Sequence, residues 1–210
     1  MAEYLEFLND VAPRVGLDAA KARSPRYTRE QADSTFLVED GAGGFRLPDV
    51  DADGDEWHPR LPVMAISWHD AVAYCAWRST REGQPYRLPT EQEWEKAARG
   101  VDGRWFPWGW RFDPSLSNMR ESRKERPAPV PVDEFPDDRS VYGVRGLGGN
   151  SQDWTVSEVI EGVGSSRRVS RIIRGGTWTS TARGCRAAFR LHGGPSDIDL
   201  SLGFRLARSL

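Results

Sequence analysis

The 210-residue chain is poor in the side chains that bind metals and has no long apolar stretch. It contains two cysteines, Cys75 and Cys185, and three histidines. Two cysteines so far apart in sequence do not form the disulfide framework of a small secreted domain. Neither a membrane-spanning run nor a targeting leader is recognisable. We therefore expect a cytoplasmic protein with free thiols.

Charge of neither sign dominates, because 29 Lys and Arg residues face 31 Asp and Glu residues. A balanced charge gives no global field that attracts nucleic acid or an anionic membrane, so we expect neither partner, and we expect a monomer. Large rings are plentiful, with nine Trp and eight Phe, and 21 Gly and 14 Pro favour turns. Residues 1–210 are predicted to form a single loop-rich globular domain.

Two capping boxes give the clearest local signals. Ser67 with Asp70, and Thr90 with Glu93, have the spacing that starts a helix. Helical periodicity predicts two inward faces, which consist of Trp68, Val72, Cys75 and Ala76 in the first helix and Trp94, Ala97 and Ala98 in the second. Gly83 and Gly100 are the expected ends.

Fewer signals mark the remaining elements. Residues 3–9 are predicted to form a short amphipathic helix, and residues 20–60 an irregular polar stretch. Residues 171–178 and 202–206 alternate as strands do. Five glycines between residues 141 and 154 indicate tight turns or close backbone approach.

Several motifs in order along residues 62–207 resemble the formylglycine-generating enzymes, the sulfatase-modifying-factor family. They are Ile66-Ser67-Trp68, Tyr86-Arg87-Leu88-Pro89-Thr90-Glu91, Phe106-Pro107-Trp108-Gly109, Gly149-Asn150 with Asp153-Trp154, Arg174-Gly175-Gly176-Thr177-Trp178 and Gly203-Phe204-Arg205. The resemblance implies an α+β, C-type-lectin-like fold with two main helices, short antiparallel strands and much irregular loop.

The resemblance does not extend to the family's catalytic residues. Active members hold copper with two cysteines that follow the Arg-Gly-Gly motif, and here the first of these positions is Ser180. One thiolate cannot form a two-sulfur Cu(I) site. The iron site of related sulfoxide synthases uses three histidines, whereas His58, His69 and His192 have no metal spacing. We expect no catalytic residues, no required cofactor and no enzymatic activity.

A structural calcium ion is one expectation that the resemblance raises. The family's calcium site uses a glycine-rich turn, and Gly149, Ser151 and Asp153 occupy matching positions. Carbonyl and carboxylate oxygens are suitable ligands for calcium. The alternative, a plain structural turn, stays open because Gly146 replaces an expected Asp or Asn.

Residues 174–206 also resemble the variable region of lectin-fold proteins diversified by diversity-generating retroelements. In that family, mutation of adenines in asparagine-type codons changes some positions while framework residues stay fixed. The candidate ligand-binding positions are Thr179, Ser180, Thr181, Gly184, Phe189, Leu191, His192, Gly193, Gly194, Ser196, Asp197, Ile198, Asp199, Leu200 and Ser201. None is Lys, Glu, Gln, Met or Trp, the five residues that such mutation of an AAC codon never produces.

These positions predict a solvent-facing surface held by strands at both ends. Exposed apolar residues among small polar ones are typical of an adaptable binding surface. The alternative is an ordinary loop whose apolar residues pack inward.

The leading functional hypothesis is a non-catalytic protein of bacterial or phage origin that binds an unknown target, expected to be a protein. The alternatives are a formylglycine-generating-enzyme-like oxidoreductase or its inactive sensory relative, such as a module of a bacterial kinase. The family's opening strands have no counterpart before residues 3–9, as expected for either a fragment or a shortened gene.

Overall fold

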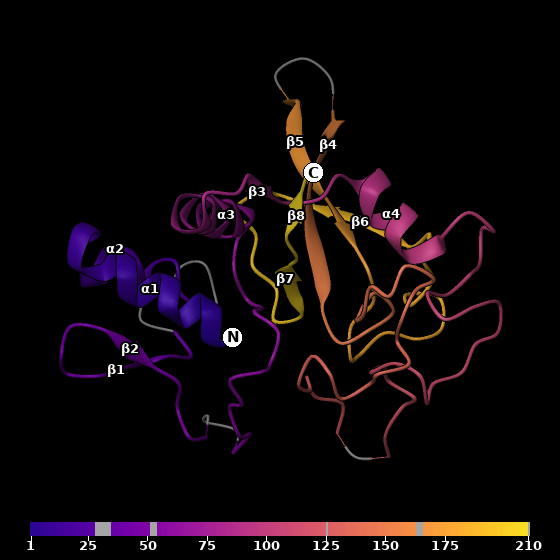
Figure 1. Ribbon diagram of the computed structural model, residues 1–210, viewed down its shortest axis with the longest axis horizontal. Helices are drawn as coiled ribbons and strands as arrows, with labels where there is room; N and C mark the ends of the chain where they lie inside the picture. The colour runs from indigo at the N-terminus through magenta and orange to yellow at the C-terminus, as the bar shows by residue number, and fades with distance from the viewer. Residues whose placement is uncertain (28–34, 51–53, 125, 163–165, 210) are drawn as a thin grey trace.

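The computed structural model describes residues 1–27, 35–50, 54–124, 126–162 and 166–209. It is an α+β fold in which loops connect short elements (Figure 1). The helices are α1 (Ala2–Val15), α2 (Leu17–Lys21), α3 (Trp68–Glu82) and α4 (Glu91–Arg99). The strands are β1 (Val38–Glu39), β2 (Phe45–Arg46), β3 (Tyr86–Arg87), β4 (Gln152–Glu161), β5 (Arg168–Arg174), β6 (Arg190–Gly193), β7 (Leu202–Phe204) and β8 (Ala207–Arg208).

The largest sheet has the strand order β6-β5-β4-β7. β5 pairs antiparallel with both β4 and β6, whereas β7 pairs parallel to β4. β4 and β5 continue beyond the sheet as a hairpin that projects from the molecule (Figure 1). Two further pairs, β1 with β2 and β3 with β8, complete the described strands.

Both predicted capping boxes are confirmed. Ser67 starts α3 and Thr90 starts α4, each with the reciprocal side-chain and backbone hydrogen bonds of the motif. α3 ends at Gly83, whose φ of 64° is left-handed and therefore suits a residue without a Cβ. α4 ends at Gly100, as its sequence predicts.

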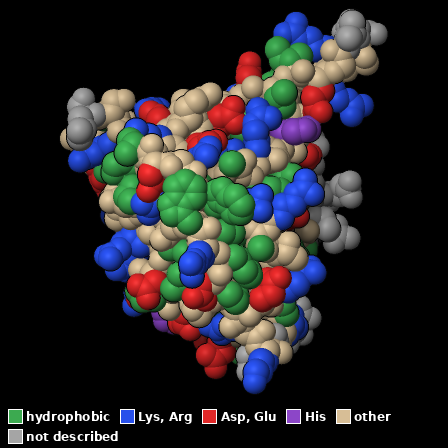
Figure 2. Space-filling view, turned by 90° about the vertical axis from the view of Figure 1, so that its right-hand side faces the viewer, with side chains coloured by type: hydrophobic (Ala, Val, Ile, Leu, Met, Phe, Trp, Pro, Cys, Tyr) green, Lys and Arg blue, Asp and Glu red, His purple; other side chains and the backbone are tan. Residues whose placement is uncertain are grey.

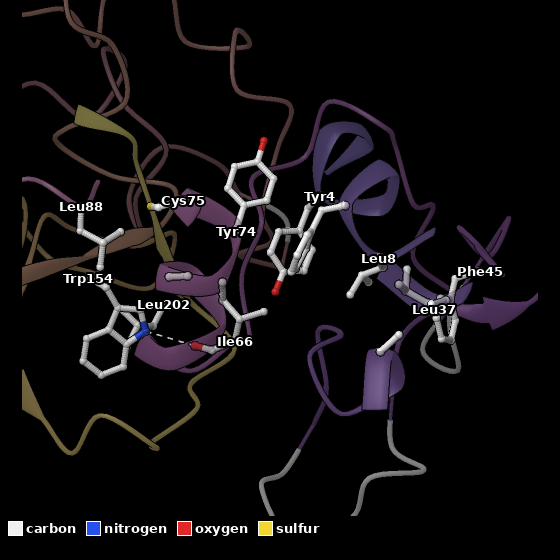
Figure 3. Close-up of a cluster of buried hydrophobic side chains, with 14 of the residues drawn as sticks. Tyr4, Leu8, Leu37, Phe45, Ile66, Tyr74, Cys75, Leu88, Trp154 and Leu202 are labelled. Carbon is white, nitrogen blue, oxygen red and sulfur yellow. Dashed lines mark hydrogen bonds between the residues drawn. The ribbon is translucent and has the colours of Figure 1, made fainter. Parts of the chain in front are cut away.

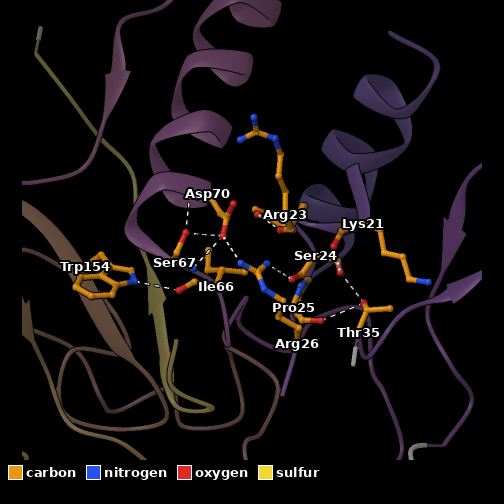
Figure 4. A network of polar contacts seen from close by, with 11 residues as sticks. Lys21, Arg23, Ser24, Pro25, Arg26, Thr35, Ile66, Ser67, Asp70 and Trp154 are labelled. Carbon is orange, nitrogen blue, oxygen red and sulfur yellow. Dashed lines mark hydrogen bonds and ion pairs between the residues drawn. The ribbon is translucent and has the colours of Figure 1, made fainter. Parts of the chain in front are cut away.

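The predicted inward face of α3 is partly wrong. Cys75 is buried, but Ala76 is exposed, and the other buried residues of this helix are Asp70, Ala71 and Tyr74. Helical periodicity did not place Asp70 on the inward face. Asp70 is buried because its carboxylate accepts a hydrogen bond from Ser67 in the capping box and pairs with Arg26 at 3.4 Å (Figure 4).

The main core lies between α1, α3 and the sheet (Figure 3). α1 is longer than the predicted residues 3–9, and it buries Tyr4, Phe7 and Leu8. The rings of Tyr4 and Tyr74 stack at 5.5 Å between centroids. Trp154 of β4 is fully buried, and its indole Nε1 donates a 3.1 Å hydrogen bond to the carbonyl of Ile66 (Figures 3 and 4). Burying a large ring with its polar atom satisfied stabilises the join between sheet and α3.

The other side of the molecule carries α4 and the loops that follow it. Figure 2 shows this face, on which hydrophobic side chains gather in the middle with charged side chains of both signs around them. Within the residues described above, no helix is both long and apolar enough to cross a membrane.

Candidate functional site

The ends of the segment 174–206 are fixed in the large sheet. Arg174 ends β5, and the β5–β6 register pairs Arg174 with Arg190 and Ile172 with His192. At the other end, Gly203 of β7 pairs with Asp153 of β4. The residues between β5 and β6 form a turn-rich region, and residues 194–201 form a loop between β6 and β7. The predicted strands at both ends are therefore present.

The buried side chain of Arg174 connects the segment to the elements that pack against it. Its side chain is 1% exposed, and its Nη2 donates to Glu95 Oε2 at 2.6 Å and to the carbonyl of Ala187 at 2.9 Å. Its guanidinium also lies 5.2 Å from the centre of the Trp94 ring. Burial lowers the pKa of Arg174, although the carboxylate of Glu95 opposes this. The arginine thus joins β5, α4 and the turn-rich region.

Close packing also fixes the turn-rich region. A Cβ on Gly176 would collide with the carbonyl oxygen of Gly148 and lie 3.1 Å from Cys185 Sγ. Cys185 and Ala187 are fully buried. Large side chains at these positions would displace the backbone, so this part of the segment has little freedom to change.

Seven of the fifteen predicted ligand-binding positions are exposed, seven are half-buried and one is buried. The exposed ones are Thr179, Thr181, Leu191, His192, Asp197, Asp199 and Leu200. The half-buried ones are Ser180, Phe189, Gly193, Gly194, Ser196, Ile198 and Ser201. Gly184 alone is buried, and Ser180 Oγ lies 2.9 Å from the place that a Cβ on it would take.

The two aspartates of the 194–201 loop accept hydrogen bonds from nearby residues of the loop. Asp197 Oδ2 accepts a 2.7 Å hydrogen bond from the backbone N–H of Gly194. Asp199 Oδ1 accepts hydrogen bonds from the backbone N–H and the hydroxyl of Ser201 at 2.8 and 2.6 Å. Such local bonds shape turns, so these carboxylates hold the loop as well as facing solvent.

An aromatic groove of about 400 Å³ adjoins this surface. Trp178 and Leu200 line it from the C-terminal segment, and Tyr27, Phe36 and Trp57 line it from the N-terminal part. The Phe36 ring centroid lies 4.0 Å from that of Tyr27 and 5.0 Å from that of Trp57. This volume is in the range of small ligand pockets. Sequence analysis missed the three N-terminal rings, whose only signal was the presence of aromatic residues in a polar stretch.

The thiols lie apart and are protonated. Cys75 belongs to the main core, whereas Cys185 packs with Phe106 and Met119 in a separate buried cluster. Burial raises the pKa of each thiol to about 12. Ser180, at the first expected copper-ligand position, has a hydroxyl that accepts a 3.0 Å hydrogen bond from the backbone N–H of Thr177. A thiol is a poor metal ligand and nucleophile in this state.

The residues of the expected calcium site have other partners. Asp153 is buried, and its Oδ2 accepts hydrogen bonds from Trp94 Nε1 at 2.8 Å and Arg205 Nε at 2.6 Å. The carbonyl of Gly149 accepts from the backbone N–H of Ser151 at 2.9 Å. No group of three or more His, Cys, Asp or Glu side chains suited to a metal occurs in the described part of the chain. These contacts favour the plain structural turn, and calcium binding stays the untested alternative.

A buried carboxylate that the sequence did not indicate supports the same turn. Asp138 accepts a 2.6 Å hydrogen bond from Ser117 Oγ and 3.1 Å bonds from the backbone N–H of Gly148. Burial raises the pKa of Asp138 to about 6, against the lowering effect of these donors. Asp138 therefore holds the glycine-rich backbone against which Gly176 packs.

The fold defines a class of protein, a formylglycine-generating-enzyme-like domain, in which Cys75 and Cys185 lie in separate buried clusters. Residues 27–210 match the family model of the sulfatase-modifying factor enzyme 1-like domain, and the chain belongs to this family. The mouse protein named inactive C-alpha-formylglycine-generating enzyme 2 is 37% identical over 79% of this chain and 54% of its own length. Mouse formylglycine-generating enzyme is 34% identical over 70% of this chain and 44% of its own length. The chain thus spans about half the length of these relatives.

Solved structures show the same fold. PvdO from Pseudomonas aeruginosa superposes with a TM-score of 0.65 and 26% identity, over 74% of this chain and 65% of PvdO. Treponema denticola variable protein 1 superposes with a TM-score of 0.61 over 92% of this chain and 80% of that protein. Its 18% identity supports a likeness of fold alone. The C-type-lectin-like α+β fold expected from the sequence is confirmed.

Proposed function

We propose that this domain is a non-catalytic binding protein whose C-terminal segment recognises a target, which we expect to be a protein. The single observation that carries the proposal is the division of residues 174–206 into two sides. Arg174, Gly176, Cys185 and Ala187 are buried and tightly packed, whereas fourteen of the fifteen candidate positions are exposed or half-buried. A fixed frame with a changeable surface is what a variable binding protein requires.

The apolar members of the surface supply its binding energy. Leu191 and Leu200 are 41% and 46% exposed. Phe189 and Ile198 are half-buried beside them in sequence. Apolar anchors surrounded by polar groups are the usual centre of a protein interface. Leu200 also lines the aromatic groove, which offers a pocket for one side chain of the target.

The thiol chemistry supports a non-catalytic role. Copper-dependent oxidation by family relatives requires two thiolates in one place. This chain has Ser180 and one buried, protonated thiol, Cys185, in the region that follows Arg-Gly-Gly. A relative of similar sequence is itself named inactive.

A peptide-display selection tests the binding proposal. A random peptide library is selected on the wild-type domain, and the enriched peptides are measured against the double variant Leu191→Ala, Leu200→Ala. Loss of binding with an unchanged melting temperature supports the proposal. The matched control is Ile160→Ala with Val169→Ala, which removes exposed apolar side chains from the projecting hairpin. Equal loss in both double variants, or none in either, contradicts it.

The gene tests whether the surface is diversified. Adenine-directed mutation of AAC codons leaves the third base unchanged, so codons at the candidate positions are expected to end in C. A near-identical template copy of the last hundred or so bases, beside a reverse transcriptase gene, is expected nearby. Codons with mixed third bases and no template would contradict diversification while leaving target binding open.

A sensory module is the second candidate function. The serine/threonine-protein kinase Pkn1 of Chlamydia trachomatis is 32% identical over 73% of this chain and only 25% of its own length. The likeness therefore covers a part of that kinase. An in-frame kinase domain in the same gene would favour this candidate. Oxidation of a thiol peptide by the copper-supplemented protein would favour the third alternative, an oxidoreductase.

A further inference from the structure

A pair of tryptophans is exposed in the loop after α4. The backbone N–H of Phe106 donates to the carbonyl of Gly109 at 2.9 Å, and that of Gly109 donates back to Phe106 at 3.0 Å. Trp105 and Trp110 are the next residues on either side of this bridge. Phe106 is buried, but Trp105 and Trp110 are 54% and 55% exposed.

Phe112, which is 39% exposed, extends the same loop. Each tryptophan leaves more than half of a large apolar surface in water, which costs free energy unless a partner covers it. Tryptophan is also among the residues that contribute most to protein interfaces.

One arginine contacts this pair directly, and two more are close along the chain to that arginine or to the pair. The Arg186 guanidinium lies 4.8 Å from the centre of the Trp105 ring, and the backbone N–H of Ala187 donates to the carbonyl of Trp105 at 2.8 Å. Arg111 follows Trp110 directly, and the backbone N–H of Arg186 donates to the carbonyl of Arg183 at 3.4 Å. The turn-rich region therefore contacts the tryptophan loop at Trp105.

These arginines differ from others nearby in their lack of carboxylate partners. Arg104 pairs with Asp102 at 2.7 Å, and Arg190 pairs with Glu91 at 2.7 Å. Among the residues that the structure describes, no Asp or Glu forms an ion pair with Arg111, Arg183 or Arg186, and all three are exposed. Positive charge beside exposed indole rings is complementary to carboxylates that are carried on an apolar chain.

We propose that Trp105, Trp110, Arg111, Arg183 and Arg186 form a docking surface for an acidic segment of another protein. Carboxylates of that segment pair with the arginines, while its apolar side chains cover the two indoles. None of the five residues is among the fifteen candidate positions of the C-terminal segment. The proposed docking surface can therefore be tested independently of the proposed target-binding function.

An acidic polypeptide fits the local charge better than a nucleic acid does. Asp102, Asp113 and Glu121 lie on the same loops as the tryptophans and the neighbouring chain. A phosphate backbone requires a row of cations without intervening acids, because its affinity depends on neutralising several phosphates. Separate carboxylates can reach individual arginines between these acids.

Fluorescence anisotropy with defined probes tests the surface. The probes are a labelled peptide of alternating Glu and Leu, the same peptide with Gln for Glu, and labelled oligo(dT). We expect the Glu peptide to bind roughly tenfold more tightly than the Gln peptide, with an affinity that falls as salt rises. Arg186→Gln, and separately Trp105→Ala with Trp110→Ala, are each expected to weaken binding roughly tenfold.

The control variants are Arg168→Gln and Tyr142→Ala, which remove an exposed arginine and an exposed ring elsewhere. They are expected to bind the Glu peptide as the wild type does. Arg186→Gln keeps the tryptophans, so it tests the surface even if the double tryptophan variant fails to fold. Equal affinity for the Glu and Gln peptides, tighter binding of oligo(dT), or wild-type affinity of a folded Arg186→Gln protein would overturn the proposal.

Discussion

Arg205 Nε donates a 2.6 Å hydrogen bond to the carboxylate of Asp153, and this contact ties the end of the candidate binding segment to the start of β4. Trp94 of α4 donates to the same oxygen at 2.8 Å. Arg205 Nη2 also donates to the carbonyl of Gly146 at 2.8 Å. One carboxylate and one guanidinium thus join α4, the glycine-rich turn and two strands of the large sheet.

Replacing Arg205 by Met is expected to destabilise the protein strongly. The substitution leaves Asp153 as a buried carboxylate without its counter-charge, which costs about 3 kcal/mol. Urea unfolding at neutral pH measures the change. Arg205→Lys keeps the charge and should cost less than Arg205→Met. An unfolding midpoint equal to that of the wild type in the Met variant would show that the ion pair is dispensable.

Calcium is expected to leave the melting temperature unchanged. Asp153 already pairs with Arg205 and Trp94, and the carbonyl of Gly149 already accepts from Ser151. Thermal unfolding with excess calcium and with a chelator measures the difference. A calcium-dependent rise that disappears in the variant Asp153→Asn would instead establish the metal site.

Asp138 is expected to make stability depend on pH. Its folded pKa of about 6 exceeds the ordinary value of 3.8, so the folded state binds the proton more tightly than the unfolded chain does. The stabilisation from this group is therefore complete below about pH 4 and is lost as pH rises through 6. Relative to Asp138→Asn, the wild type should lose about 2–3 kcal/mol across that window. Urea unfolding of both proteins at several pH values checks this, and a constant difference would refute it.

Neither cysteine is expected to react in the folded protein. Burial raises the pKa of Cys75 and of Cys185 to about 12, so almost no thiolate is present at neutral pH. A chromogenic disulfide reagent should label both thiols only at the rate of unfolding, and fully in urea. Rapid native labelling of Cys185 would contradict the view that it is a buried packing residue.

Neighbouring leucines in the segment are expected to respond differently to truncation. Leu202→Ala removes a buried side chain next to Ile66 and Trp154 and should cost about 3 kcal/mol. Leu191→Ala and Leu200→Ala remove exposed side chains, and each should change stability by less than about 0.5 kcal/mol. Chemical unfolding of the three variants measures this. A large loss at Leu191 or Leu200 would support the alternative that the loop packs inward.

Local sequence signals predicted α3 and α4 well because the causes of these two helices are local. The Ser67–Asp70 and Thr90–Glu93 capping boxes depend on residues three positions apart. The motifs around Arg174 and Gly203 similarly located the ends of the candidate segment.

Strand β4 was not predicted from the sequence, and the reason is physical. Its outer half belongs to the projecting hairpin, where Val156, Ile160 and the facing Val169 are exposed. Apolar residues there do not mark a buried face, and the bulge between Trp154 and Glu158 interrupts the alternation. The glycine-rich run that precedes the strand gave the stronger signal.

The composition of the two surfaces also depends on the tertiary fold. Tyr27, Phe36 and Trp57 meet Trp178 and Leu200 across more than half of the chain. Arg186, in the turn-rich region after β5, lies over Trp105, in the loop after α4. No spacing rule connects such positions, so only the fold could bring them together.

A saturation-substitution scan of residues 174–206, read out as protease resistance of the displayed domain, tests the central claim most directly. We predict that Arg174, Gly176, Cys185, Ala187 and Gly203 tolerate almost no replacement. Leu191, His192, Leu200 and the other exposed candidates should accept most side chains and remain folded. Uniform tolerance along the segment, or intolerance at Leu191 and Leu200, would contradict a fixed frame that carries a changeable binding surface.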